Sequence, residues 1–208
     1  VKVGSLAGVN NGTIKNVEVY ISSNVGDEVD FTGVTAGSIN FGGIVGLNNG
    51  IISNSRSELK LRANKGHLAG FVSNNEGTIT SCYYKNALIT NLGEDEISST
   101  TAGFVNINNG EIKFSFIEGE QSNVDNGRYL SNSLLSSYCI TAPTSVGGFV
   151  YNNIGNIEDC DSNLSITSQS FSGGFVFTNS GTIKQCYSAS KNENENSEAH
   201  APFLATKI

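Results

Sequence analysis

The sequence has 208 residues, enough for one domain with a continuous core, and its hydrophobic content of 38% is typical of a folded protein. The formal net charge is −7 and guanidinium groups occur only at Arg56, Arg62 and Arg128, which argues against a nucleic-acid surface with its clustered Lys and Arg. No signal peptide is visible, and no apolar run reaches the roughly 20 residues that cross a membrane.

Along the chain, one unit recurs. The first copy begins at Ser5 and is followed by an insertion at about residues 22–40. Copies with the sequence GGIVGLNNGII at 42–52 and GGFVFTNSGTI at 173–183 are the clearest. Further copies begin at Gly70, Gly103 and Gly148, with a second insertion at about 118–145, and a seventh copy starts at Ala201. Since the seventh copy stops before its turn Gly and the sequence contains no Met, we expect a piece of a longer chain.

Three positions keep one residue type in all six full copies. The Asn positions are Asn10, Asn48, Asn75, Asn108, Asn153 and Asn179. The turn glycines are Gly12, Gly50, Gly77, Gly110, Gly155 and Gly181, and the isoleucines are Ile14, Ile52, Ile79, Ile112, Ile157 and Ile183. If the copies stack, the amides are expected to hydrogen-bond along the stack, and the glycines to supply a backbone φ above zero.

The spacing of the copies predicts an all-β solenoid. Successive copies recur at intervals of roughly 26 to 45 residues, and no apolar spacing of three and four residues indicates a helix. The shorter intervals leave too little room for the four strands of a propeller blade, whereas about three strands per coil of a parallel β-helix fit. We therefore expect one domain over residues 1–208, with six to seven coils about 4.8 Å apart and the insertions projecting sideways.

The pattern Gly-Gly-Phe/Ile-Val-x-x-Asn-x-Gly-Thr-Ile-x-x-Cys-Tyr, fullest at 173–187 and 69–83, resembles the GLUG repeat. This repeat occurs in large exported bacterial proteins, including haemagglutinin-like adhesins and IgA-peptidase-like proteins. The resemblance implies a right-handed parallel β-helix in a secreted or surface-displayed protein with a role in virulence. The terminal copies depart from the pattern, as at Ser5, Ala7 and Pro202, and the ends of solenoids are commonly atypical.

Three of the four cysteines share one position in the repeat, five residues after the turn Gly. That position holds Val17, Ser55, Cys82, Ser115, Cys160 and Cys186. Buried thiols that fill narrow core space are the first interpretation. A disulfide between Cys160 and Cys186, on adjacent coils, is the alternative, and Cys82 is expected to lie too far from Cys160. No Cys-x-x-Cys pair supports a zinc site.

The sequence indicates no catalytic site. His67 and His200 are one register apart, and no serine-hydrolase or metalloprotease motif occurs. The acidic groups at Asp27, Glu28 and Asp30, at 94–96 and at 193–198 are expected to be solvated loop tips, with a calcium or glycan site as the alternative. No cofactor or metal is predicted.

The leading hypothesis for function is therefore a non-catalytic stalk or adhesive module. It would bind a host-surface protein or glycan through its loops, with Arg128, Tyr129 and Tyr138 of the second insertion as candidate binding residues. A carbohydrate-active enzyme that uses the lateral groove, and a carrier segment of a large toxin, are the alternatives. The open ends of the solenoid predict a tendency to self-associate.

Overall fold

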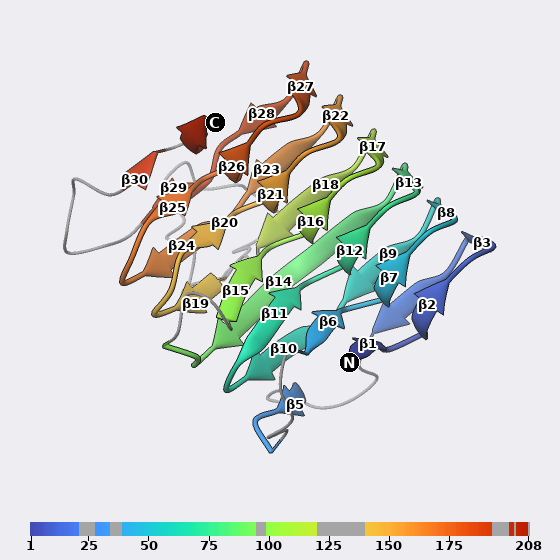
Figure 1. Cartoon of the computed structure of the whole chain (residues 1–208), viewed down its shortest axis with the longest axis horizontal. Helices are drawn as coiled ribbons and strands as arrows, with labels where there is room; N and C mark the ends of the chain where they lie inside the picture. Colours follow the sequence, from blue (N-terminus) through green and yellow to red (C-terminus); the bar gives the residue numbers. More distant parts are fainter. Residues whose placement is uncertain are drawn as a thin grey trace, which may run out of the picture.

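The computed structural model describes residues 1–20, 28–33, 39–94, 99–119, 140–192, 200–201 and 203–207. Within these ranges the chain forms 31 short strands and no helix. Strands at equivalent places in successive coils pair in parallel and follow one another in sequence order along the stack (Figure 1). The predicted parallel β-helix is therefore confirmed.

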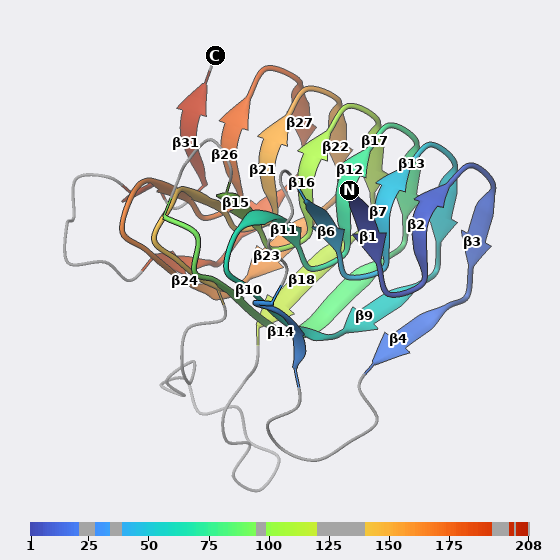
Figure 2. The ribbon, with the colours of Figure 1, turned by 60° about the horizontal axis from the view of Figure 1, so that its bottom comes forward.

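Four sheets run along the stack, seen from a second side in Figure 2. Sheet A contains β1 (Lys2–Gly4), β6 (Asn40–Gly42), β11 (Gly66–Ala69), β15 (Ser99–Ala102), β20 (Val146–Gly147), β25 (Ser172–Gly173) and β30 (His200–Ala201). Sheet B contains β2 (Ala7–Asn10), β7 (Val45–Asn48), β12 (Val72–Asn75), β16 (Val105–Asn108), β21 (Val150–Asn153), β26 (Val176–Asn179) and β31 (Leu204–Lys207). Sheet C contains β3 (Thr13–Lys15), β8 (Ile51–Ser53), β13 (Thr78–Thr80), β17 (Glu111–Lys113), β22 (Asn156–Glu158) and β27 (Thr182–Lys184).

The fourth sheet has two parts, D and E, joined by the long strand β14 (Tyr83–Asn91). Part D contains β4 (Glu18–Tyr20), β9 (Arg56–Glu58), β18 (Phe116–Gly119), β23 (Asp161–Asn163) and β28 (Tyr187–Ser188). Part E contains β5 (Val29–Phe31), β10 (Lys60–Ala63), β19 (Ile140–Ala142), β24 (Ser165–Ser168) and β29 (Lys191–Asn192).

A coil contains more strands than the predicted three. In the second coil the chain passes through five strands, β6 to β10, before it begins the third coil at β11. The corner between sheets C and D is made without Gly or Pro. At the corner between sheets C and D, each full copy places one non-Gly residue in the left-handed region, with φ between 48° and 56°. These residues are Asn16, Asn54, Ser81, Phe114, Asp159 and Gln185.

One part of every coil has a constant length. Each coil has one residue in register with Gly42, at the end of sheet A, and one in register with Arg56, at the start of sheet D. These two residues are always 14 positions apart. The pairs are Gly4 and Glu18, Gly42 and Arg56, Ala69 and Tyr83, Ala102 and Phe116, Gly147 and Asp161, and Gly173 and Tyr187. We call this part, from sheet A through sheets B and C to sheet D, the constant segment.

The remainder of the coil, the variable segment, returns from sheet D through sheet E to the end of sheet A. It covers 12 positions from Asp161 to Gly173 but 31 from Phe116 to Gly147. Both insertions predicted from the sequence belong to this segment. Parts of them join the stack, since β5 pairs with β10 and β19 pairs with β24.

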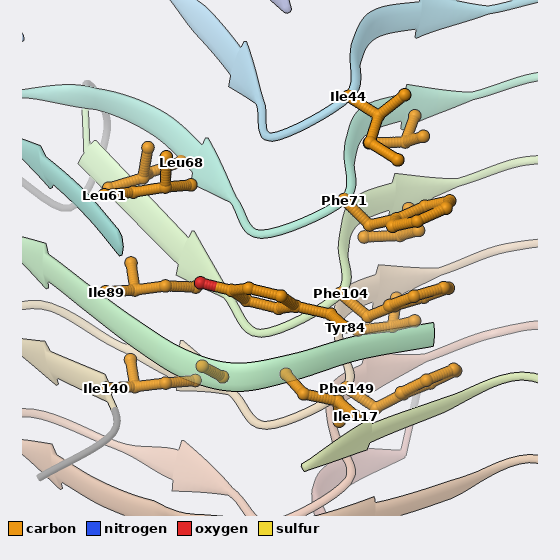
Figure 3. Close-up of a cluster of buried hydrophobic side chains, with 14 of the residues drawn as sticks. Ile44, Leu61, Leu68, Phe71, Tyr84, Ile89, Phe104, Ile117, Ile140 and Phe149 are labelled. Atoms are coloured by element: carbon orange, nitrogen blue, oxygen red, sulfur yellow. The ribbon is translucent and has the colours of Figure 1, made fainter. Parts of the chain in front are cut away.

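The core is a set of columns in which like residues stack on like. Five phenylalanines of the corner between sheets A and B form one column, with ring centroids 4.5 to 4.9 Å apart from Phe71 to Phe203. Figure 3 shows three members of this column, Phe71, Phe104 and Phe149, with the Tyr84 ring extending across the core away from them, toward Ile89. The hydroxyl of Tyr84 donates to the carbonyl of Leu59 at 2.5 Å, which satisfies the polar end of this fully buried ring. Each buried large side chain contributes roughly 1.5–3 kcal/mol.

Adjacent apolar residues in the repeat are both buried, although strict strand alternation would bury only one. Phe175 and Val176 have no exposed surface. Phe175 lies at the corner that precedes β26, and Val176 is the first residue of that strand. The turn of the chain at the corner therefore directs both side chains inward, and the same holds for Phe104 and Val105.

The turn glycines are required for a reason that differs from the predicted one. None of them has a positive φ; among the described glycines only Gly66 does, at 110°. A Cβ atom on Gly110 would lie 2.0 Å from the carbonyl oxygen of Gly77 in the preceding coil. Gly12 belongs to the first coil, and a Cβ atom there would meet nothing within 4 Å. Glycine is thus needed because stacked turns approach too closely for any side chain.

Candidate functional site

The recurring Asn position of the repeat forms a continuous ladder from the first coil to the sixth. Each side-chain Nδ2 donates to the Oδ1 of the Asn in the following coil at 2.7 to 2.8 Å. The amide of Asn75 also donates to the carbonyl of Gly77 at 3.2 Å, and Asn153 donates equivalently to Gly155 at 3.3 Å. The ladder satisfies amides that are at most 8% exposed, and its role is to hold the coils in register.

The position that holds Ser or Cys from the second coil onward makes the same contact in each of those coils. The Ser55 hydroxyl donates to the carbonyl of Ser53 at 2.8 Å, and the Cys160 thiol lies 3.1 Å from the carbonyl of Glu158. Both partners lie two residues earlier, across the left-handed corner. Ser and Cys fit this position because each is small and offers one donor to that carbonyl.

The described cysteines are free thiols with different environments. Cys82 and Cys160 are buried, whereas Cys186 is partly exposed. Burial raises the pKa of Cys82 to about 12. A hydrogen bond with Cys186, together with burial, raises the pKa of Cys160, and the same hydrogen bond lowers the pKa of Cys186. Cys186 is therefore the thiol that ionises most readily among these three.

The outer face of part D is the described surface next to the second insertion, since the chain leaves it at Gly119. We call it the sheet D face. It comprises Arg56, Tyr83, Lys85, Phe116, Glu118 and Asp161. The rings of Tyr83 and Phe116 stack with centroids 5.0 Å apart and planes 5° from parallel, and the Lys85 ammonium lies 5.6 Å from the Tyr83 centroid.

Charged residues at the N-terminal end of this sheet join the first coil to the second. Arg56 forms ion pairs with Glu18 in the first coil and with Glu58 in its own strand. Arg62 pairs with Glu28 at 3.3 Å. These pairs are partly exposed, so each contributes at most about 1 kcal/mol, but they occupy both described arginines within the stack.

Asp161 carries the perturbed carboxyl group of the sheet D face. Desolvation of the carboxyl group, and secondarily the nearby charge of Glu118, raise its pKa. The residue as a whole is exposed, so the carboxylate can still reach a ligand from solvent. The face thus combines stacked aromatic rings, one ammonium group, one guanidinium group and two carboxylates, which are groups suited to hydrogen-bond and contact a polar ligand.

A polar network missed in the sequence joins sheets A and B outside the core. The Thr100 hydroxyl donates to Asn106 Oδ1 at 2.9 Å and lies 2.7 Å from His67 Nδ1. Because the hydroxyl has only one proton, His67 Nδ1 is the donor to Thr100. Burial lowers the pKa of His67, which favours the neutral ring. Nothing in the repeat pattern indicated this contact, since it joins unlike residues from two sheets.

The structure does not bring the two histidines together. In the strand register of sheet A, His67 is opposite Asn40 and Thr100. His200 is opposite Ser172, which lies one position further along the strand register. Of the acidic groups, Glu28 pairs with Arg62, and Asp30 accepts a hydrogen bond from the Thr32 amide at 2.7 Å. That bond lowers the pKa of Asp30.

Several predicted residues lie outside the described ranges. They are the candidate binding residues Arg128, Tyr129 and Tyr138, together with Cys139, Asp27, Asp95, Glu96, Glu193, Glu195, Glu198 and Pro202. In the part of the chain that the structure describes, no three His, Cys, Asp or Glu side chains are grouped so that they could hold a metal ion. The described residues likewise include no helix long and apolar enough to cross a membrane.

The chain was compared with protein-family models, with curated proteins and with solved structures, and none of them matches it. The resemblance to the GLUG repeat therefore stays a hypothesis that rests on the repeat residues themselves.

Proposed function

We propose that this chain is a non-catalytic repeat module of a secreted or surface-displayed bacterial protein. It acts as a rigid spacer whose variable segments present binding surfaces to a host protein or glycan. The observation that carries the proposal is the division of every coil into a constant and a variable segment. A module of this kind needs a backbone of fixed geometry and a side whose length and sequence are free to change.

The mechanical part of the proposal rests on the ladders. Columns of Asn, Ile and Phe continue through the coils, so each coil is held by side-chain contacts as well as by strand pairing. Six coils at the usual strand spacing give a rod about 29 Å long. Such a rod separates whatever lies at its two ends by a fixed distance.

The binding part of the proposal assigns the ligand surface to the second insertion and the adjoining sheet D face. Strand β18 ends at Gly119, one residue after Glu118, and β19 begins at Ile140, so the two described ends of the second insertion are these residues. Tyr83, Phe116 and Asp161 lie on the same strand surface beside this point. Aromatic and charged groups at the base of a long insertion would extend the contact area that the insertion itself provides.

The test is binding of the purified chain to arrays of host glycans and extracellular proteins. One variant has residues 120–139 replaced by a short Gly-Ser linker, and a matched control has residues 95–98 replaced in the same way. We expect specific binding that is lost only in the first variant, with both variants unfolding at the same urea concentration. Binding that survives removal of 120–139 would refute the assignment to this insertion. If neither the parent chain nor the control binds, the adhesive role is wrong and a passive spacer remains.

A further inference from the structure

Cys160 and Cys186 occupy the same position in adjacent coils. Their following residues, Asp161 and Tyr187, are paired in register, and the Tyr187 amide donates to the carbonyl of Cys160 at 3.0 Å. Adjacent parallel strands are about 4.8 Å apart, which lies within the range of Cα separations that a disulfide spans. The backbone therefore already places the two cysteines at bridging distance.

The two cysteine side chains also make the same contact with the backbone. The Cys160 thiol lies 3.1 Å from the carbonyl of Glu158, and the Cys186 thiol lies 3.0 Å from the carbonyl of Lys184. Each follows a left-handed corner residue, Asp159 or Gln185. Equivalent contacts on stacked coils place one thiol above the other, so that each thiol alters the pKa of its neighbour.

Their exposure differs because Cys186 lies at the last described level of sheets C and D, whereas Cys160 lies one level deeper. In sheets C and D no described strand covers β27 and β28, whereas β30 and β31 extend sheets A and B by one level. Beside this difference in the extent of the sheets lies a pocket of about 450 Å³. It is lined by Asn179, Thr182, Ile183, Gln185, Cys186 and Phe203. A small molecule in the pocket can reach Cys186, whereas Cys160 is 2% exposed and lies one coil deeper.

The third described cysteine supplies an internal comparison. Cys82 shares the column and the carbonyl contact, here to Thr80 at 3.2 Å, but it is fully buried. Its neighbours in the column are Ser55 below and Ser115 above. Cys82 therefore has neither access to solvent nor a thiol beside it.

We propose that Cys186 and Cys160 form a reactive thiol pair that a small disulfide, such as glutathione disulfide, oxidises to a disulfide between the fifth and sixth coils. The lowered pKa of Cys186 supports this assignment of roles. This inference is independent of the proposed adhesive function. Its consequence is a covalent clamp on the last complete coil of the described stack.

The reaction proceeds by two thiol–disulfide exchanges. The Cys186 thiolate attacks one sulfur of glutathione disulfide, forming a mixed disulfide and releasing one glutathione thiolate. Cys160 then gives its proton to that thiolate and attacks the Cys186 sulfur, which releases the second glutathione. Two protein thiols are oxidised to one disulfide, and one glutathione disulfide is reduced to two glutathiones.

The test uses the full chain with Cys139→Ser, so that only the three described cysteines remain. After incubation with glutathione disulfide, intact mass should show the loss of two hydrogens. Cleavage after Glu158 and Lys184 places Cys160 and Cys186 on separate peptides, which should remain joined until a reductant is added. The oxidised chain should also unfold at a higher urea concentration than the reduced chain.

Three variants define the roles. Cys160→Ser should stop at one glutathione attached to Cys186, Cys186→Ser should gain nothing, and Cys82→Ser should still form the bridge. Serine occupies this position in two natural copies, Ser55 and Ser115, so the variants are expected to fold. The proposal is overturned if Cys186 reacts no faster than Cys82, or if glutathione stays on Cys186 while Cys160 is intact.

Discussion

The constant and the variable segments of each coil differ in how they are tied to their neighbours. In the constant segment every coil adds one Asn to the ladder, one Ile to its column and, in all but the first coil, one Gly to a turn with no room for a side chain. Each contact needs its partner at the same position of the next coil. In the variable segment the strands of part E still pair, yet the length of the chain around them changes. Side-chain ladders in strict register, rather than strand pairing alone, therefore fix the length of the constant segment.

The largest effect is expected from one added residue. Inserting one Ala between Asn109 and Gly110 should lower the free energy of unfolding by about 5 kcal/mol or more, because the shift turns Ile112 away from its column and reverses the faces of β17. The same insertion between residues 129 and 130, in the variable segment, should cost less than about 0.5 kcal/mol. Urea unfolding followed by circular dichroism measures both. Equal losses would show that the two segments are equally constrained.

A break within the ladder should have the next largest effect. In Asn108→Leu, the Oδ1 of Asn153 loses its donor and the Nδ2 of Asn75 loses its acceptor in the ladder, so we expect a loss of about 2–4 kcal/mol. Asn10→Leu removes the end member, which has one neighbour in the ladder, and should cost about 1 kcal/mol. The comparison is made by urea unfolding at one pH. A similar cost at both positions would mean that the amides act singly, not as a ladder.

The close approach of the turns can be tested with a methyl group. Gly110→Ala places a Cβ atom 2.0 Å from the Gly77 carbonyl oxygen, so the coils must move apart, at an expected cost of about 1–3 kcal/mol. Gly12→Ala meets no atom within 4 Å and should leave stability unchanged or raise it by about 0.5 kcal/mol, through the lower entropy of the unfolded chain. Thermal unfolding distinguishes the two. If Gly12→Ala destabilises as much as Gly110→Ala, the turn conformation and not the stacking would explain the glycines.

The smallest effect is expected at the left-handed corner. Phe114 has φ 50° and is 57% exposed, so Phe114→Asn should raise stability by about 1 kcal/mol, since Asn adopts this conformation more readily. Phe171 is 56% exposed in the variable segment and does not have a positive φ. Phe171→Asn should therefore bring no gain. A gain at both positions, measured by urea unfolding, would trace the effect to the removal of an exposed aromatic ring.

The sequence predicted those features of the fold that repeat by residue type. Asn, Gly and Ile recur at fixed spacing, and stacking follows because like positions in a solenoid lie above one another. The left-handed corner could not be predicted in this way, since Asn, Ser, Phe, Asp and Gln share no common chemistry there. The turn glycines were predicted for the wrong reason, because a Gly position is compatible with either a positive φ or a close approach. Only the separation of the coils decides between them.

The functional surface was less predictable than the fold. The sequence directed attention to the second insertion because Arg128 and its aromatic neighbours break the repeat, and those residues lie outside the described ranges. The sheet D face was missed because Tyr83 and Phe116 are 33 positions apart and meet only when the coils stack. The pairing of Cys160 with Cys186 was available as an alternative, but the partial exposure of Cys186 depends on which sheets have a described strand at the seventh level.

The Asn ladder gives the stack a direction. In every bond the Nδ2 donor belongs to the earlier coil and the Oδ1 acceptor to the later one, so the amide dipoles add along the axis. The donor end is at Asn179 and the acceptor end is at Asn10. The residue in register beyond Asn179 is Lys207, a residue type with no side-chain acceptor, so the series of amide bonds stops there. A coil that preceded Asn10 could lengthen this ladder only by bringing a donor, and two stacks that met by their Asn10 ends would oppose acceptor to acceptor.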